Sequence, residues 1–452
     1  MPLTDEHLAI RFGYGLPLHP ETPRTPAGIV AALKGPDPAS AQWPLPDLAR
    51  FAPMVASLQA LQKKAKSGVD VKADYDAAQA AIVGLVTLGH RSGFARAIDT
   101  PQPFRERLVT FFADHFTVSP RGGASGLYLP FALVEGAIRP HIGGSFVDMV
   151  QAVTLHPGML IYLDQQASIG PNSPMGKKQG KGLNENLARE LMELHTLGVD
   201  GGYSQTDVRQ LAELLTGLTV TRDLTVAFEA KRVEPGAEEV MGKSYGSDKL
   251  AAITAVLRDL ALHPATAAHI ARKLAVHFLS DTPDPTAVEA IRTAFVTTGG
   301  DIPSLALALL SHPAATRPGA DKLRQPFDFM AAACRALGVT GAEILAMKGG
   351  DFKRGFLHAS EQMGQKLKYA PGPDGWPEAG EVWVTPPRLA ARIDWAMSMP
   401  QRLKKDMPDP VALARLSLGD HAGDTLLTAA ARAESRRDGV GIVLSSPEFN
   451  RR

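Results

Sequence analysis

Cysteine is nearly absent from this sequence, in which Cys334 is the single one among 452 residues. One cysteine cannot form a disulfide within the chain, so other interactions must hold the fold together. Cys334 follows three alanines in an apolar run, where a thiol packs as a small hydrophobic side chain. A reactive thiolate needs a polar, partly exposed setting, so we do not expect cysteine-based catalysis.

The sequence also lacks an excess of charge of either sign, and it lacks long apolar runs. Its 48 basic and 47 acidic residues give a formal net charge of +1, so we expect no nucleic-acid partner. No segment approaches the roughly 18 consecutive apolar residues of a membrane span. The N-terminal segment carries Asp5, Glu6 and Arg11 instead of the apolar run of a signal peptide, so we expect a cytoplasmic location.

What is present is an ordinary globular composition, with 44% apolar and 21% charged residues. A chain of this length can bury a large core without disulfides. Apolar residues recur at helical spacing in stretches such as 104–116, 183–197 and 207–218, separated by proline and glycine. The sequence therefore predicts a mainly α, large multi-helix globular fold.

Segment 218–233 departs from helical spacing, because apolar and polar residues alternate along it. This alternation predicts a small β-hairpin insertion. A looser change near residue 245 separates an N-terminal helical region, 1–245, from a C-terminal helical region, 246–452. The first region carries the polar motifs, and we expect the two regions to pack as one unit.

A His-Pro pair occurs three times, at His156-Pro157, His263-Pro264 and His312-Pro313, each time before a run rich in alanine or leucine. Proline suits the first turn of a helix. We therefore interpret these pairs as helix starts first and as functional histidines second.

The segment from Asn184 to Gly198 is the most polar of the predicted helices. Asn184 is a candidate N-cap, and Gly198 is a candidate helix end. At about 100° per residue, Leu187, Leu191 and Leu194 form one stripe that should face the core. The pattern predicts a well-bounded helix with one apolar face.

Asn186, Glu190 and Glu193 lie beside that apolar stripe. Two carboxylates three residues apart repel each other unless a cation, an arginine or a shared proton lies between them. The pair is typical of a metal-binding edge or of acid/base catalysis, so Glu190 and Glu193 are candidate catalytic residues. The structural alternative is that Glu185 pairs with Arg189 at the i,i+4 spacing and that the other carboxylates form ordinary ion pairs.

Two histidines, His115 and His195, are further candidate catalytic residues. His195 points roughly 140° away from Glu190 around the helix, so a metal site there would need His115 or Asp114 from another helix. The candidate ligands of a divalent metal are thus Asp114, His115, Glu190 and Glu193. His115 either meets the Glu190 helix in space or is a structural, hydrogen-bonded histidine.

The Gly/Pro-rich loop from Gly170 to Gly182 precedes the polar helix and contains three lysines. Ammonium groups and a helix N-terminus can receive an anionic substrate, although a solvated surface loop is the alternative. Other Gly/Pro-rich loops span 120–126 and 370–380, and the first two of the three loops are candidate walls or lids. The candidate substrate-binding residues are Asn184, Asn186, Arg189, Lys177, Lys178 and Lys181.

The string from Asn184 to Val208 resembles the signature of the domain of unknown function 1800 family. Further matching phrases lie at 11–15, 114–119, 156–164, 271–274 and 277–278. They run through most of the chain, which is identified as a single member of this family. The resemblance implies a mainly helical bacterial protein with no established activity, and it implies that many members are exported, although this sequence shows no export signal.

Two hypotheses about function follow. The first is a hydrolase-like enzyme acting on a small or polymeric polar substrate through Glu190 and Glu193, with or without a divalent metal. The second is a non-enzymatic binding or assembly protein with a protein partner, in which the polar helix is a structural network. An open cleft beside the glutamates favours the enzyme, and a dry, fully paired network favours the scaffold.

Overall fold

The computed structural model describes residues 3–180, 182–246, 249–317, 319 and 322–452. Over these residues the protein has 25 α-helices and two separate two-stranded antiparallel sheets, which confirms the predicted mainly α fold. None of the helices in these ranges is long and apolar enough to cross a membrane.

Many helices start with a capping side chain followed by proline. Thr25, Asp284 and Asp409 each accept a hydrogen bond from a backbone amide in the first turn, and proline follows each of them. The three His-Pro pairs use the same device, because Nδ1 of each histidine accepts from the amide two residues ahead. The interpretation of these pairs as helix starts is confirmed, with His312 opening a 3₁₀ turn.

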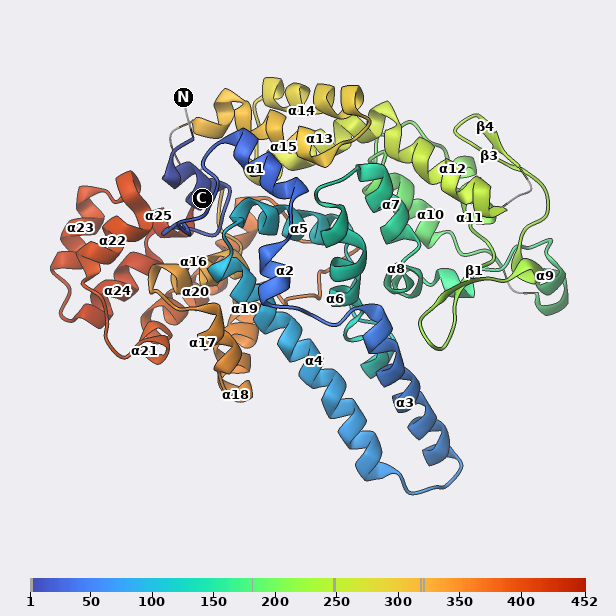
Figure 1. Cartoon of the computed structure of the whole chain (residues 1–452), viewed down its shortest axis with the longest axis horizontal. Helices are drawn as coiled ribbons and strands as arrows, with labels where there is room; N and C mark the ends of the chain where they lie inside the picture. Colours follow the sequence, from blue (N-terminus) through green and yellow to red (C-terminus); the bar gives the residue numbers. More distant parts are fainter. Residues whose placement is uncertain (1–2, 181, 247–248, 318, 320–321) are drawn as a thin grey trace.

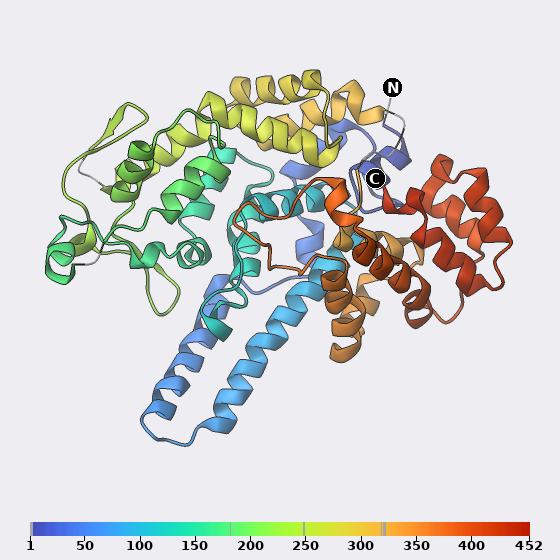
Figure 2. The same cartoon turned by 180° about the vertical axis from the view of Figure 1, so that it is seen from behind.

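The N-terminal helices form a projecting arm and the centre of the body. Helices α3 and α4 lie antiparallel and extend well beyond the other helices, and the inner end of α4 enters the body (Figures 1 and 2). The bounds are α1 (Pro26–Lys34), α2 (Pro38–Gln42), α3 (Leu48–Lys66), α4 (Lys72–Asp99), α5 (Pro103–His115), α6 (Leu129–Leu133), α7 (Phe146–Thr154), α8 (Pro157–Tyr162), α9 (Pro174–Gln179), α10 (Asn186–Glu190) and α11 (Gln205–Leu214).

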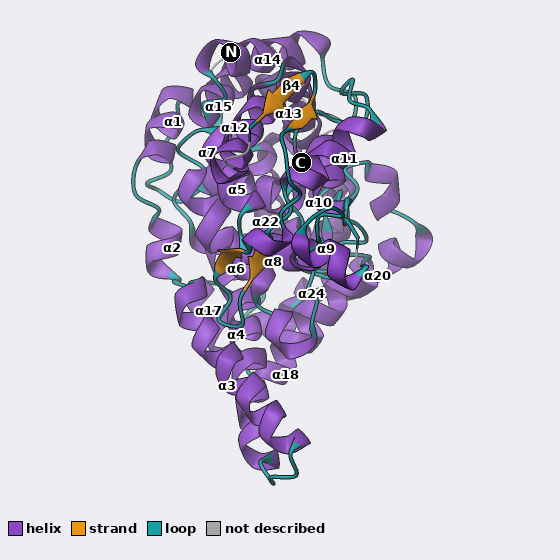
Figure 3. Ribbon diagram, turned by 90° about the vertical axis from the view of Figure 1, so that its right-hand side faces the viewer, coloured by secondary structure: helices purple, strands orange, loops and turns teal. Residues whose placement is uncertain are grey.

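Both sheets follow α11, and Figure 3 shows them as small additions to a helical body. Strands β1 (Leu218–Val220) and β2 (Val226–Phe228) pair with Leu218 opposite Phe228, which confirms the predicted hairpin. A second hairpin, β3 (Glu238–Val240) with β4 (Lys243–Tyr245), follows directly.

The remaining helices cover one long side of the molecule and fill the end opposite the hairpins (Figure 1). Their bounds are α12 (Lys249–Leu262), α13 (Pro264–Phe278), α14 (Pro285–Thr298), α15 (Ile302–Ser311), α16 (Pro326–Ala336), α17 (Gly341–Ala346), α18 (Gly349–Phe352), α19 (Ala359–Gln362), α20 (Pro386–Ser398), α21 (Pro400–Leu403), α22 (Pro410–Leu418), α23 (Asp424–Ala431), α24 (Arg436–Ser445) and α25 (Pro447–Asn450).

Three clusters of buried side chains form the core. The largest joins α5, α7 and α10 to α12 and α13, so it takes residues from both sides of position 245. The second lies among the C-terminal helices and includes Cys334, which is fully buried as the apolar run predicts. Burial also raises the pKa of its thiol, so the thiol stays protonated.

The polar helix differs from the expected one in its last turn. Helix α10 continues into a π-helical turn, Leu191–His195. A π turn holds more residues than an α turn, so it rotates the following side chains around the axis. Met192 and His195 are therefore buried and Leu194 is only half-buried, so the prediction that Leu194 faces the core was wrong.

Candidate functional site

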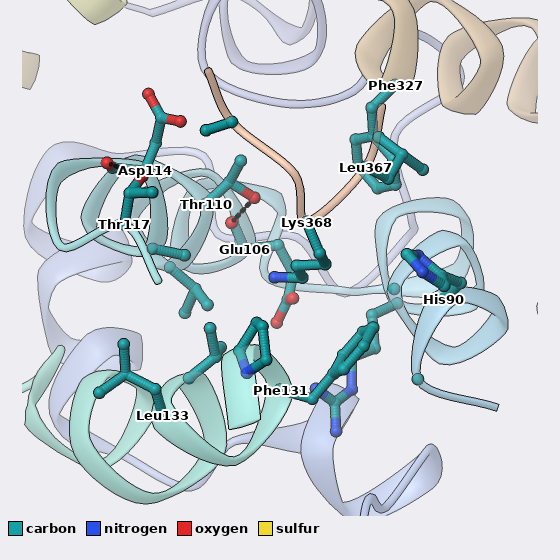
Figure 4. A pocket seen from close by; sticks show the side chains of 18 of the residues that line it. His90, Glu106, Thr110, Asp114, Thr117, Phe131, Leu133, Phe327, Leu367 and Lys368 are labelled. Carbon is teal, nitrogen blue, oxygen red and sulfur yellow. Dashed lines mark hydrogen bonds between the residues drawn. The ribbon is translucent and has the colours of Figure 1, made fainter. Parts of the chain in front are cut away.

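A cavity of about 190 Å³, partly open to the surface, lies where α4, α5 and α6 meet the loop after α19. Figure 4 shows the Lys368 side chain reaching from this loop into the cavity toward Glu106, with Phe131 and His90 to one side and Asp114 at the other end of the view. We call it the Lys368 cavity, and its walls come from both sides of residue 245. A dry cavity of roughly 150 Å³ holds a benzene molecule, so a small organic molecule fits here.

Lys368 is the most unusual residue of the cavity. Its Nζ lies 5.2 Å from the centre of the Phe131 ring, and its side chain has no hydrogen bond or ion pair with any described residue. Its backbone φ is +66°, a left-handed conformation that a lysine rarely adopts. Burial lowers the pKa of Lys368 to about 8, although the charges of Glu135 and Asp114 act in the opposite direction.

The carboxylates on the floor of the cavity are already occupied. Arg139 binds both oxygens of Glu106, at 2.7 and 2.9 Å, and Arg96 binds both oxygens of Glu135, at 2.5 and 3.0 Å. Such bidentate pairs fix both partners in place. They leave Lys368 as a cation without a counter-ion of its own.

His90 lies on α4 beside Lys368. Its ring meets Phe131 edge-on, with 5.0 Å between the ring centres, and neither ring nitrogen has a hydrogen bond with a described residue. Burial, and then the charge of Lys368, lower the pKa of His90 to about 3. The imidazole is therefore neutral at physiological pH and can accept a proton only weakly.

Asp114 lies near the C-terminal end of α5 and, like Glu106 on the same helix, lines the cavity. The Trp376 amide donates to both of its carboxylate oxygens, at 2.9 and 3.2 Å. Burial outweighs this bond and raises the pKa of Asp114 to about 7. Near neutral pH the carboxyl group thus exists in both protonation states, as a general acid or base requires.

The predicted catalytic pair, Glu190 and Glu193, does not line the Lys368 cavity. Both residues are half-buried on α10 and the π turn after it. Burial, and then the charge of Glu193, raise the pKa of Glu190. The pair therefore repels as its spacing predicts, and its catalytic role stays a prediction.

The two predicted histidines lie close together beneath this helix. Nε2 of His115 donates to the His195 carbonyl at 3.1 Å, so His115 does meet the Glu190 helix. Its Nδ1 lies 3.0 Å from Nζ of Lys273, which donates to it. The His195 ring is fully buried, and neither of its nitrogens has a hydrogen-bond partner among the described residues. His115 thus has the bonds of a structural histidine, while its catalytic role is untested.

The four predicted metal ligands do not converge. Asp114 receives the Trp376 amide, whereas His115 is bonded to Lys273 on the opposite side of α5 from the cavity floor. In the part of the chain that the structure describes, no group of three or more His, Cys, Asp or Glu side chains could hold a metal ion. The geometry gives no support to a metal centre at Glu190 and Glu193.

The predicted substrate-binding residues divide into two sets. Arg189 pairs with Glu185 at 3.1 Å, as the structural alternative predicts, and Gln205 bonds to both. Asn184 and Asn186 border an open surface pocket together with Arg232, and Asn184 Oδ1 accepts from the Asn186 amide. Lys177 and Lys178 are exposed on α9 and do not line this pocket, while Lys181 lies outside the described residues.

Most of the residues that line the Lys368 cavity were not predicted as site residues from the sequence. His90, Glu106 and Phe131 lie in ordinary helical patterns, and Lys368 stands alone between apolar residues. Two signals in the sequence pointed to the cavity: Asp114, a candidate metal ligand, lines it, and so do Ala370 and Trp376 of the Gly/Pro-rich loop 370–380. Unlike the first two loops, it had not been singled out as a wall.

Fold and site together define a mainly helical protein with a partly charged cavity. The family model described as "Protein of unknown function (DUF1800)" matches residues 7–451, so the chain belongs to this family. No curated protein and no solved structure matches it. The family description carries no activity, so the argument for a function rests on the chemistry of the site.

Proposed function

We propose that this protein is an acid/base enzyme that acts on a small carbonyl compound in the Lys368 cavity. The observation that carries the proposal is an amino group without a counter-ion in a partly open cavity that Asp114 also lines. Concave, largely apolar cavities with a few polar groups are typical of small-molecule sites. Groups with shifted pKa values are typical of catalytic ones.

Asp114 is the proton donor in this proposal. A carboxyl group with a pKa of about 7 can protonate a carbonyl oxygen near neutral pH and take the proton back. Protonation activates an ester or amide for attack by water, and it activates a ketone for loss of its α-proton. Hydrolysis of an ester or amide, the first hypothesis from the sequence, is one of these reactions. In this proposal Asp114 on α5 supplies the acid, in place of a glutamate on α10.

The test is deuterium exchange at the methyl group of acetophenone, followed by proton NMR in D₂O. Acetophenone has a ring that suits the apolar walls and a carbonyl group next to an exchangeable methyl group. We expect exchange above the buffer rate, and we expect Asp114→Asn to lower it by about 100-fold, a common effect of removing a general acid.

Two further variants show where the exchange happens. Ala113→Leu adds bulk to the cavity wall and should suppress exchange, whereas Lys177→Met on exposed α9 is the matched control and should not. Exchange at the buffer rate in the folded wild-type protein contradicts the proposal. So does exchange that Ala113→Leu leaves unchanged.

A second candidate function is hydrolase-like catalysis by Glu190 and Glu193. The raised pKa of Glu190 favours it, since a carboxyl group that keeps its proton can act as an acid. The competing scaffold hypothesis is supported by the Glu185, Arg189 and Gln205 network. Elemental analysis and ester hydrolysis by the wild type and a Glu190→Gln/Glu193→Gln variant test the pair: activity or metal lost from a folded variant supports catalysis there.

A further inference from the structure

We infer that Lys368 is the covalent attachment point for the substrate, and that its amino group condenses with an aldehyde or ketone to form an imine. This inference rests on the proposed function and narrows its substrate class from carbonyl compounds in general to aldehydes and ketones. It gives a chemical role to the one lysine that the cavity surrounds.

Among the described residues, the other lysines with buried or half-buried side chains all have a partner that explains them. Lys249 pairs with Glu238, and Lys322 pairs with Asp281 and Glu378. Lys273 donates to His115 at 3.0 Å. A buried ammonium group costs free energy unless it is paired, so structural lysines in this protein are paired ones. Lys368, whose side chain is half-buried, is the exception, since among the described residues only the Phe131 ring lies against its ammonium group.

The backbone holds Lys368 in the position that aims it into the cavity. The Tyr369 amide donates to the Lys366 carbonyl at 2.9 Å, which closes a tight turn around Leu367 and Lys368. Lys368 has a φ of +66° in this turn, a strained conformation for a lysine. Leu367 of the turn also lines the cavity, as does Ala370 directly after it, so the turn presents two of its residues to one space (Figure 4).

Burial favours the neutral form of Lys368, and the nearby acidic groups only partly oppose it. Glu135 and Asp114 attract its proton, but Glu135 is bound by Arg96 and Asp114 by a backbone amide. Arg139, Arg96 and His90 lie on the surrounding helices, and the two arginines oppose a positive charge on Lys368. With a pKa of about 8, roughly a tenth of the side chain is free amine at pH 7, against roughly one part in 3,000 for an ordinary lysine.

The reaction balances without any further reagent. The lone pair of the neutral amine attacks the carbonyl carbon and forms the C–N bond, while the carbonyl oxygen takes a proton from Asp114. The nitrogen, which carries a positive charge after the attack, returns a proton to the Asp114 carboxylate and leaves a neutral carbinolamine. Asp114 then gives this proton to the hydroxyl group, which leaves as water. What remains is a protonated imine, and its positive charge replaces that of the lysine beside Phe131.

Reductive trapping with benzaldehyde and sodium cyanoborohydride tests the inference on the full-length wild-type protein. Cyanoborohydride reduces the imine to a stable benzyl amine, and peptide mass spectrometry gives the initial labelling rate of each lysine. At pH 7 we expect Lys368 to react at least about tenfold faster than exposed Lys177 and Lys178. Paired Lys249 and Lys322 are the buried controls and should stay unlabelled.

The pH dependence and a competitor give two further readouts. The labelling rate of Lys368 should rise with a midpoint near pH 8, while that of Lys177 should keep rising toward pH 10. Excess benzamide, which has a carbonyl group but does not condense with amines, should slow labelling of Lys368 alone. A Lys368 rate equal to that of Lys177, or a midpoint near pH 10, overturns the inference.

Acetophenone exchange by a folded Lys368→Met variant separates this inference from the proposed function. Loss of exchange together with labelling of Lys368 supports both. If exchange persists in the variant and Lys368 of the wild type is not labelled, the imine inference is wrong and the proposal of acid/base catalysis is supported. Labelling of Lys368 without exchange supports a reactive amine and contradicts the proposed enzyme activity. If neither labelling nor exchange is observed, both proposals are wrong.

Discussion

Burial shifts the pKa values of Asp114 and Lys368 in opposite directions. Burial raises the pKa of the aspartate to about 7 and lowers that of the lysine to about 8. Removal from water penalises the charged form in both cases, so an acid keeps its proton and an amine loses one. Both groups line the same cavity and therefore titrate near neutral pH, where acid/base catalysts work best.

Asp114→Asn should change how stability depends on pH. The folded protein binds the Asp114 proton more tightly than the unfolded chain, whose carboxyl group has a pKa near 3.8. The contribution of Asp114 to stability is therefore fully present below about pH 3.8 and is lost as the pH rises toward 7. Asparagine does not titrate, so the variant should gain stability relative to the wild type between pH 4 and pH 8. Thermal melting across this range measures the difference, and parallel curves contradict the assignment.

Lys368→Met should stabilise the protein at neutral pH. The folded state holds the lysine with a pKa of about 8, below its usual 10.5, so the wild type gains stability as the pH rises from 8 toward 10.5. Methionine carries no charge into the cavity, and we expect a gain of about 1–3 kcal/mol at pH 7. Urea unfolding at pH 7 and pH 10 checks this, because the gain should shrink at the higher pH. Lys322→Met, which breaks a paired lysine, should instead destabilise.

At the scale of elements, the His-Pro pairs show that a histidine can have a structural role at a helix start. His263 Nδ1 accepts the Ala265 amide at 3.2 Å where α13 begins. Helix α13 carries Lys273 and His277, which lie beside the predicted histidine cluster and the cavity. Its first turn therefore helps to position groups at both places.

His263→Ala should cost about 1 kcal/mol of stability, the usual value of an N-cap. His263→Asn supplies another acceptor at the same place and should restore most of it. Chemical denaturation of the three proteins measures both steps. Equal losses in the two variants would show that the ring acts through packing and not through its hydrogen bond.

The π turn after α10 is the element whose conformation the sequence periodicity did not predict. A period of 3.6 residues placed Leu194 on the core face, but the wider turn buries Met192 and His195 in its place. Nothing in the local sequence separates five α-helical residues from five π-helical ones. The choice depends on the contacts available to both helix faces, among them the bond between His115 and the His195 carbonyl.

At the scale of the whole molecule, buried ion pairs join segments that are far apart in the sequence. Arg107 on α5 pairs with Asp328 on α16, and Nη2 of the same arginine lies 3.0 Å from His277 on α13. Asp328 and His277 both line the Lys368 cavity, so this network holds three helices around one wall of the site.

Arg107→Met should cost about 3–5 kcal/mol, because it leaves the buried carboxylate of Asp328 without its main partner. Adding Asp328→Leu removes that unpaired charge, so the double variant should be more stable than the single one. Urea denaturation of the wild type, both single variants and the double variant provides the cycle. Additive losses would mean that the two side chains act independently.

Local sequence patterns determined the mainly α class, the first β-hairpin, the helix starts at the His-Pro pairs and the Glu185–Arg189 pair. Each of these depends on residues close together in the chain, where spacing and capping act directly. Only the tertiary structure decided the cavity, since His90, Asp114 and Lys368 come from three segments far apart in the sequence. Burial and the absence of a counter-ion make Lys368 chemically distinct, and both are properties of its surroundings that its place in the sequence does not encode.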